Sequence, residues 1–291
     1  MEKIFSRQDY FYTQFRVIVT YLRLLFLPVN QNFFYDYPVY HSFFDMPVLL
    51  SFVFLAALFG LGVYLITKQV KEVPQPQPVI RLMGFGILWF FITLSVESSV
   101  IPLWMLINEY RMYLPSAGII ITVATGVSLL DNRVRGKAVF LLLAIVVVLS
   151  IATHLRNEVW QDNVKLWEDT AQKSPGKTTV HNNLGNSYAA LNMTDKAIEQ
   201  YLIAIKLDPY NAEAYYNLGN RYAILNMTGM AIEQYLLAVN LKPDYAEAHF
   251  NLGLLYSIMG QPENARRELE NGLNIKPDDQ KAQQLLQMLS H

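Results

Sequence analysis

The sequence predicts an all-α protein in which a polytopic helical membrane region is followed by an α-solenoid of short helical repeats. Long apolar runs occupy residues 46–155, and runs of this length are typical of helices that span a bilayer. Residues 178–279 repeat with a period of 34 residues, which is typical of stacked helical hairpins. The mean hydropathy of +0.19, with only 16% charged residues, is high for a wholly soluble chain and favours the membrane region.

The composition argues against several classes of protein. A net charge of −1 argues against a general nucleic-acid binder, because such proteins carry a basic stripe. The absence of cysteine excludes disulfides, thiolate catalysis and cysteine-ligated metal centres. The sequence has no glycine-rich phosphate loop, and its five histidines show no spacing typical of metal ligands. We therefore expect no metal, no cofactor and no nucleic-acid partner.

Residues 1–45 are expected to form an extracytoplasmic or interfacial segment with one amphipathic helix. Within residues 9–27, apolar side chains recur at helical spacing, while Arg16 and Arg23 lie on another face. This pattern favours a helix that lies in the membrane interface. A spanning helix is the alternative for these residues.

Four spans are predicted in the membrane region, at residues 46–67, 82–106, 115–130 and 138–155. A helix of about 20 residues crosses a hydrocarbon core of about 30 Å. The third span is short and rich in Gly, Ala, Ser and Thr, a composition that lets helices pack closely in lipid. The fourth span contains an uninterrupted apolar run from Val139 to Val148.

Basic residues predict the orientation of the spans. They gather in the short connections after the first and the third span, namely Lys68, Lys71 and Arg81, then Arg133, Arg135 and Lys137. Connections rich in Lys and Arg face the cytoplasm. We therefore expect an integral membrane protein, of a bacterial inner membrane, with everything after residue 155 on the extracytoplasmic face.

Three consecutive units of 34 residues, 178–211, 212–245 and 246–279, share the same key positions. Each unit has a Leu-Gly pair, a tyrosine, an alanine and a closing proline, which are Leu184–Gly185, Tyr188, Ala197 and Pro209 in the first unit. These positions resemble those of the tetratricopeptide-repeat (TPR) family. The glycine lets the second helix of a pair approach closely, and the proline ends the unit because it cannot continue a helix. Residues 156–177 are expected to form a linker and a half-repeat helix, and residues 280–291 a capping helix.

Asparagines recur on the first helix of each unit, in one full row (Asn183, Asn217 and Asn251) and one partial row (Asn186 and Asn220). An amide side chain both donates and accepts, so a ladder of amides can pair with an extended peptide backbone. The rows resemble the asparagine ladder in the TPR domains of O-linked N-acetylglucosamine transferases. The alternative is that Asn-Leu-Gly is simply common in such repeats. Tyr216 and Phe250, one position earlier, are either exposed anchors in the same groove or ordinary packing aromatics.

Two segments, Asn192-Met-Thr194 and Asn226-Met-Thr228, fit the glycosylation sequon. Both fall in the turn between paired helices, where Asn and Thr are favoured for local reasons. We expect the local reason to account for them.

A charged loop between the second and third spans contains Glu109 and Arg111, followed by Tyr113-Leu-Pro-Ser. Charges this close to hydrocarbon are costly and usually functional, and a guanidinium can bind a lipid phosphate. The alternative is a structural ion pair at a helix end. The segment resembles E-x-R-x-Y-L-P-S of the transmembrane and TPR-containing O-mannosyltransferases and their bacterial relatives, which are GT-C glycosyltransferases. The resemblance extends to residues 20–25, 35–38 and 166–175.

That family implies transfer of a sugar from a polyprenyl-phosphate carrier to a hydroxyl on the extracytoplasmic side. GT-C enzymes, however, carry their catalytic carboxylate in the first extracytoplasmic loop and have more than four spans. Asp36 and Asp45 do not match that motif, so no catalytic residue is assigned. The expected function is a membrane-anchored TPR protein that binds a polypeptide ligand on the extracytoplasmic face and contacts membrane lipid, including polyprenyl phosphate. The alternative is a truncated GT-C-like glycosyltransferase acting on protein Ser or Thr.

Overall fold

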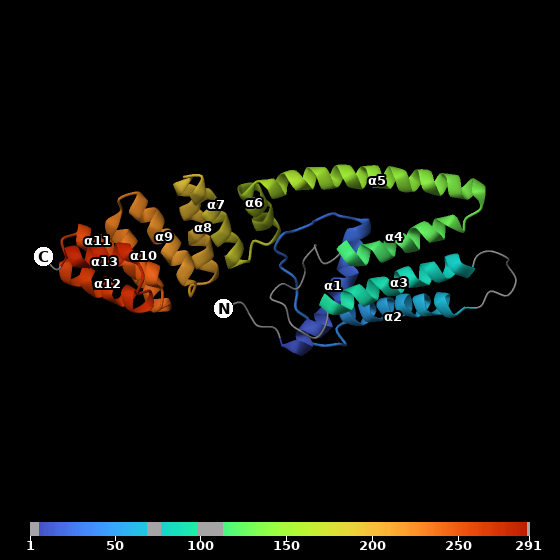
Figure 1. Cartoon of the computed structure of the whole chain (residues 1–291), viewed down its shortest axis with the longest axis horizontal. Helices are drawn as coiled ribbons and strands as arrows, with labels where there is room; N and C mark the ends of the chain where they lie inside the picture. Colours follow the sequence, from blue (N-terminus) through green and yellow to red (C-terminus); the bar gives the residue numbers. More distant parts are fainter. Residues whose placement is uncertain (1–5, 69–76, 98–112, 290–291) are drawn as a thin grey trace. The chain divides into compact units, whose positions relative to one another are not determined.

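The structure, a computed structural model, describes residues 6–68, 77–97 and 113–289, and within them it contains helices but no strand (Figure 1). The predicted all-α class is therefore confirmed. The chain divides into two compact units, Met1–Glu158 and Val159–His291. The first unit holds α1 (Arg7–Phe26), α2 (Met46–Thr67), α3 (Gln77–Glu97), α4 (Tyr113–Ser128) and most of α5 (Asn132–Gln161).

Three of the described helices contain a stretch long and apolar enough to cross a membrane, which are Met46–Thr67, Pro78–Ser95 and Asn132–Gln161. The third predicted span, at residues 115–130, corresponds to a shorter apolar helix, Leu114–Ser128. The second predicted span begins earlier than expected, because α3 starts at Gln77, and Pro78 favours a helix start. Its predicted end, beyond residue 97, lies outside the described residues.

Glycines bring α2, α3 and α4 together. A Cβ added at Gly84 would lie 2.7 Å from the backbone oxygen of Gly62 on α2. A Cβ added at Gly86 would lie 2.5 Å from the backbone oxygen of Gly118 on α4. Both distances are far shorter than a normal contact between non-bonded heavy atoms. The two faces of α3 therefore pack backbone to backbone, as small residues allow in membrane helices.

The N-terminal helix α1 buries one face against the other helices of its unit. Val17, Tyr21 and Leu22 join one apolar cluster with residues of α2, α3 and α4, namely Leu55, Phe90, Leu94 and Ile119. The segment after α1 contacts the same helix: the Tyr40 backbone N–H donates a hydrogen bond to Thr13 Oγ1 at 3.0 Å. The amphipathic character of this helix and its placement in the membrane interface stay predictions.

Helix α5 differs from α1 because none of its residues is buried. Large apolar side chains such as Phe140 and Val148 stand 74% and 64% exposed. A helix that is apolar on all sides needs apolar surroundings. The exposed surface of α5 is therefore typical of a helix that contacts lipid.

The second unit is a series of helical hairpins preceded by α6 (Asn163–Lys173) and closed by α13 (Gln280–Met288). The hairpins are α7 (Thr178–Ala190) with α8 (Thr194–Leu207), α9 (Ala212–Ile224) with α10 (Thr228–Leu241), and α11 (Ala246–Ile258) with α12 (Pro262–Ile275). Only Asp162 separates α5 from α6, and its carboxylate caps α6 by accepting from the N–H groups of Val164 and Lys165.

Each hairpin of the array is closed by one large side chain against one glycine. A Cβ added at Gly219 would lie 2.7 Å from two ring carbons of Tyr235, and Gly185 stands in the same relation to Tyr201. In the third hairpin Leu269 lies against Gly253. The side chains of Tyr201, Tyr235 and Leu269 are almost completely buried. They set the distance between the paired helices.

Candidate functional site: the asparagine rows

The asparagines singled out by the sequence lie on the first helices of the three hairpins. Asn183 and Asn186 are on α7, Asn217 and Asn220 on α9, and Asn251 on α11. Asn186 is exposed and the other four are half-buried. The amides therefore remain within reach of a ligand, but they are also close enough to the core to bond inside the array.

Two of the amides accept a hydrogen bond from the second helix of their own hairpin. The Tyr201 hydroxyl donates to Asn186 Oδ1 at 2.7 Å, and the Tyr235 hydroxyl donates to Asn220 Oδ1 at 2.7 Å. Burial raises the pKa of Tyr201 to about 12 and raises that of Tyr235 as well. Both hydroxyls therefore keep their proton and remain donors at ordinary pH.

Other bonds run from one hairpin to the next. Asn217 Nδ2 donates to Asn182 Oδ1 at 3.2 Å. Asn251 Nδ2 donates to Asn220 Oδ1 at 3.0 Å and to the Tyr235 hydroxyl at 3.2 Å. The asparagine rows thus link neighbouring repeats. The sequence reasoning missed Asn182, which occupies the repeat position that Tyr216 and Phe250 hold in the later units.

Each of these amides keeps part of its hydrogen-bonding capacity. Within the described part of the chain, Asn186 and Asn220 accept through Oδ1 while their Nδ2 groups have no partner. Asn217 and Asn251 donate through Nδ2 while their Oδ1 atoms have no partner among the residues that the structure describes. The rows therefore offer both donors and acceptors, which is what a peptide backbone requires.

Tyr216 and Phe250 have packing contacts inside the array. The Tyr216 ring lies 5.8 Å from the ring of Tyr235 and 4.8 Å from that of Tyr245, centroid to centroid. The Phe250 ring lies directly against Gly272 on α12. Both side chains are half-buried. These contacts favour the packing interpretation of the two aromatics.

The sequon asparagines have a conformational reason for their position. Asn192 and Asn226 adopt φ angles of 58° and 57°, and Gly260 takes the same place in the third hairpin with φ of 68°. Asparagine and glycine are the residues that tolerate this left-handed conformation best. The geometry supports the local explanation for both asparagines.

Two histidines at equivalent repeat positions tie two of the first helices, α7 and α11, to the preceding turn. His181 lies 2.9 Å from Gln200 Oε1 and 2.9 Å from the Pro175 carbonyl. His249 lies 2.8 Å from Glu268 Oε2 and 3.1 Å from the Pro243 carbonyl. The sequence reasoning treated the histidines only as possible metal ligands. No group of three or more metal-ligating side chains occurs in the residues described.

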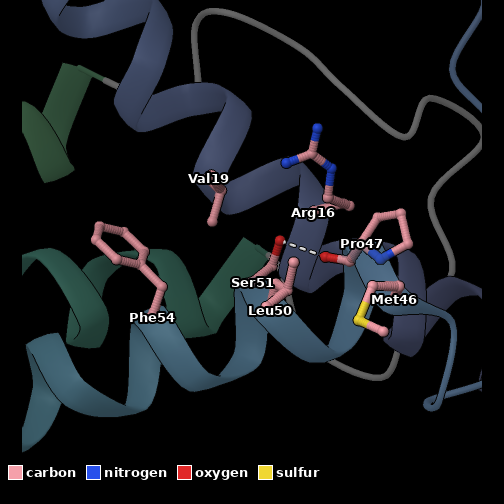
Figure 2. Close-up of a pocket in the computed structure, with 7 residues that line it drawn as sticks. All are labelled: Arg16, Val19, Met46, Pro47, Leu50, Ser51 and Phe54. Carbon is pink, nitrogen blue, oxygen red and sulfur yellow. Dashed lines mark hydrogen bonds between the residues drawn. The ribbon is translucent and has the colours of Figure 1, made fainter.

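In the first unit, a recess with a volume of about 370 Å³ lies between α1 and α2. Figure 2 shows its lining, in which Val19, Leu50 and Phe54 provide apolar side chains and Arg16 provides the one charge. Ser51 donates its hydroxyl proton to the Pro47 carbonyl at 2.7 Å. Glu109 and Arg111, the predicted lipid-phosphate ligands, lie outside the described residues.

Comparisons with known proteins bear mainly on the array. Models of the TPR repeat match residues 185–226 and 219–260, and a tetratricopeptide-repeat model matches residues 246–279. Mouse protein O-mannosyl-transferase TMTC3 is 25% identical over 180 residues, which is 61% of this chain. The match covers only 19% of that relative's length.

Solved structures similar to part of this chain include TPR domains. A crystal structure of MamA is 28% identical, with a TM-score of 0.41, over 43% of this chain and 74% of that one. The first TPR of Spaghetti (RPAP3), bound to the HSP90 peptide SRMEEVD, is 28% identical, with a TM-score of 0.38, over 39% of this chain and 90% of that one. By the repeat models, residues 185–279 of this all-α chain are tetratricopeptide repeats, a type of repeat that presents an extended protein-binding surface.

Proposed function

We propose that this chain is a membrane-anchored TPR protein that binds an extended polypeptide along the asparagine rows of its array. The proposal rests on amide side chains on consecutive first helices, each of which has bonded either its donor or its acceptor but not both within the described chain. Their internal bonds hold the side chains in place, while donors on Asn186 and Asn220 and acceptors on Asn217 and Asn251 stay unpaired in the described chain. Because these side chains are already held in place, they can bond the backbone of a peptide of any sequence without a further loss of side-chain entropy.

The anchor in this proposal is the set of apolar helices α2, α3 and α5. Only Asp162 separates α5 from α6, and α6 directly precedes the first hairpin, so the repeats follow closely after the last apolar helix. A polypeptide bound by the array is therefore held close to the bilayer.

The array lies on the extracytoplasmic face in this proposal, because the basic residues of the two short connections face the cytoplasm. The chain contains no cysteine, so single cysteines report their own location. Tyr210→Cys in the array is expected to react with a membrane-impermeant maleimide in intact cells, and Arg133→Cys only after the cells are opened. The reverse pattern would contradict the orientation.

Peptide binding is tested by selection on the full chain in lipid nanodiscs, with a phage-displayed library of random, unstructured peptides. Peptides that need the asparagine rows are expected to be enriched on the wild-type protein and depleted on Asn183→Ala. Asn183 is the residue chosen for substitution because its side chain makes no hydrogen bond within the described chain. Asn240→Ala, an exposed asparagine on α10, is the control and should retain the same peptides. If neither substitution changes which peptides are enriched, the asparagine rows do not bind the peptide.

A second function is favoured by the similarity to an O-mannosyl-transferase. In it, the membrane unit binds a polyprenyl-phosphate sugar and transfers the sugar to Ser or Thr of the bound polypeptide. Glu109 and Arg111 are the proposed lipid-phosphate ligands. The recess beside Arg16 supports lipid binding in the described part, since a hydrocarbon chain fits along Leu50 and Phe54 with its phosphate near the guanidinium.

Radiolabelled sugar transfer from a polyprenyl-phosphate donor to a Ser/Thr peptide tests this second function. The full chain should transfer sugar, and Arg111→Ala should abolish transfer while peptide binding persists. Absence of transfer by the wild-type chain that still binds peptide would leave the binding function alone.

A further inference from the structure

The turns inside the three hairpins expose large apolar side chains. The turns connect α7 to α8, α9 to α10 and α11 to α12, and each carries a leucine, isoleucine or methionine at its tip. We name as the turn edge six of these residues, which are 42% to 68% exposed, namely Leu191, Ile224, Leu225, Met227, Ile258 and Met259. Contiguous apolar patches on a soluble protein usually mark a place of interaction.

The turn edge is also free of charge. Residues 189–194, 223–230 and 257–262 contain no Asp, Glu, Lys or Arg, while Asp195, Lys196 and Glu263 follow directly in the first turns of α8 and α12. The turns that follow each hairpin are different, since they carry Asp208, Lys242, Asp244, Lys276, Asp278 and Asp279. Stacked repeats place equivalent turns along the same edge. The array therefore has one edge with uncharged, apolar turn tips and an opposite edge with charged turns.

Chain connectivity indicates what covers the apolar edge. The array is joined through α6 to α5, a helix that is apolar enough to span a membrane and has no buried residue. A bilayer that holds α5 is thus present next to every copy of the array, at an effective concentration that no diffusing partner reaches. The tips carry side chains that enter the boundary between headgroups and hydrocarbon without burying an ion.

We propose that the turn edge inserts into the headgroup–hydrocarbon boundary of the bilayer and holds the array against the membrane surface. This inference rests on the proposed membrane anchor. The array is mildly acidic, with 8 Lys and Arg against 12 Asp and Glu in residues 178–291, so attraction to anionic lipid does not drive the contact. Insertion is driven by the apolar side chains and is insensitive to salt.

The contact gives the asparagine rows a fixed position. An array held by α5 at one end and by its turn edge along its length has little freedom to rotate. The bound polypeptide then runs beside the bilayer at a constant distance. This arrangement suits a protein that presents a chain to membrane-embedded machinery.

Lipid-dependent quenching in the full chain tests the inference. Single-cysteine variants Leu191→Cys, Leu225→Cys and Ile258→Cys carry an environment-sensitive fluorophore, in nanodiscs of phosphatidylcholine with or without doxyl-labelled lipid. Their emission is expected to be lost with doxyl lipid and to resist aqueous iodide, at low and at high salt. Tyr210→Cys, on the opposite edge and 80% exposed, is the matched control and should show the reverse.

Val146→Cys on α5 separates this inference from the anchor on which it rests. Quenching of Val146 by doxyl lipid without quenching of the three turn positions would overturn the inference and leave the anchor intact. Failure at Val146 as well would overturn both. Turn positions that are shielded from iodide but not quenched by lipid would show that a second copy or another protein covers the edge, which also overturns the inference.

Discussion

Replacing Gly219 by alanine is expected to destabilise the array, although alanine is the better helix former. The added Cβ would lie 2.7 Å from Cδ1 and Cε1 of Tyr235, where carbon atoms in contact normally stand about 3.5–4.0 Å apart. The ring cannot move aside easily. It is 2% exposed, and its hydroxyl is held by Asn220 at 2.7 Å and by Asn251 at 3.2 Å.

The magnitude follows from two opposing terms. Overpacking of a closed site typically costs about 1–3 kcal/mol, and the higher helix propensity of alanine returns at most about 1 kcal/mol. Gly229→Ala is the matched control, because Gly229 lies on α10 with no atom within 4 Å of its added Cβ. It should be neutral or stabilising. The two variants are therefore expected to differ by roughly 2 kcal/mol.

Hydrogen exchange of the α9 and α10 amides, measured by mass spectrometry on the full chain in nanodiscs, reports the free energy of local opening. Faster exchange is expected in Gly219→Ala and unchanged or slower exchange in Gly229→Ala. If Gly219→Ala protects these amides as well as Gly229→Ala does, the contact between Gly219 and Tyr235 does not set the hairpin spacing.

Three further outcomes follow from the array. Tyr235→Phe removes a hydroxyl that bonds both Asn220 and Asn251, so hydrogen exchange in α9–α11 should report a loss of about 1–2 kcal/mol, and no loss would contradict the network. Glu268→Gln should be tolerated, because Gln200 fills the equivalent place beside His181. Glu268→Leu leaves the His249 Nδ1 unpaired and should lower the free energy of unfolding in urea by about 1–3 kcal/mol. Equal costs for the two variants would contradict this pairing. Stability should fall as pH rises from 10 to 12, because the pKa of buried Tyr201 is raised to about 12, so the folded state keeps a proton that the unfolded state releases from pH 10. The loss at Tyr201 reaches about 2–3 kcal/mol, and Tyr201→Phe should make the pH dependence of urea unfolding shallower; an unchanged slope would contradict the assignment.

Periodicity predicted the class of the fold because it records burial directly. The 34-residue period predicted the stacked hairpins, and the unbroken apolar runs predicted α2 and α5. Pattern alone did not place the start of α3, since Arg81 interrupts the apolar run while the helix already begins at Gln77. Nor could it reveal that Gly84 and Gly86 face different partners, which depends on how three helices cross.

The internal bonds of the asparagine rows were less visible, although the sequence contains a signal for one of them. Asn186 and Tyr201 are 15 residues apart, as are Asn220 and Tyr235. In the third unit both positions change together, to Leu254 and Leu269. Two positions that are both polar in two repeats and both apolar in the third are typical of side chains in contact. The bonds between hairpins, such as Asn217 to Asn182, join non-equivalent positions and leave no such trace.

The affinity of the full chain for a selected peptide tests the central claim most directly. Fluorescence anisotropy with the chain in nanodiscs should show binding that weakens roughly threefold to tenfold in Asn183→Ala, the worth of one hydrogen bond, and stays unchanged in Asn240→Ala. Equal affinity in the wild-type chain and both variants would show that the polypeptide does not lie along the asparagine rows.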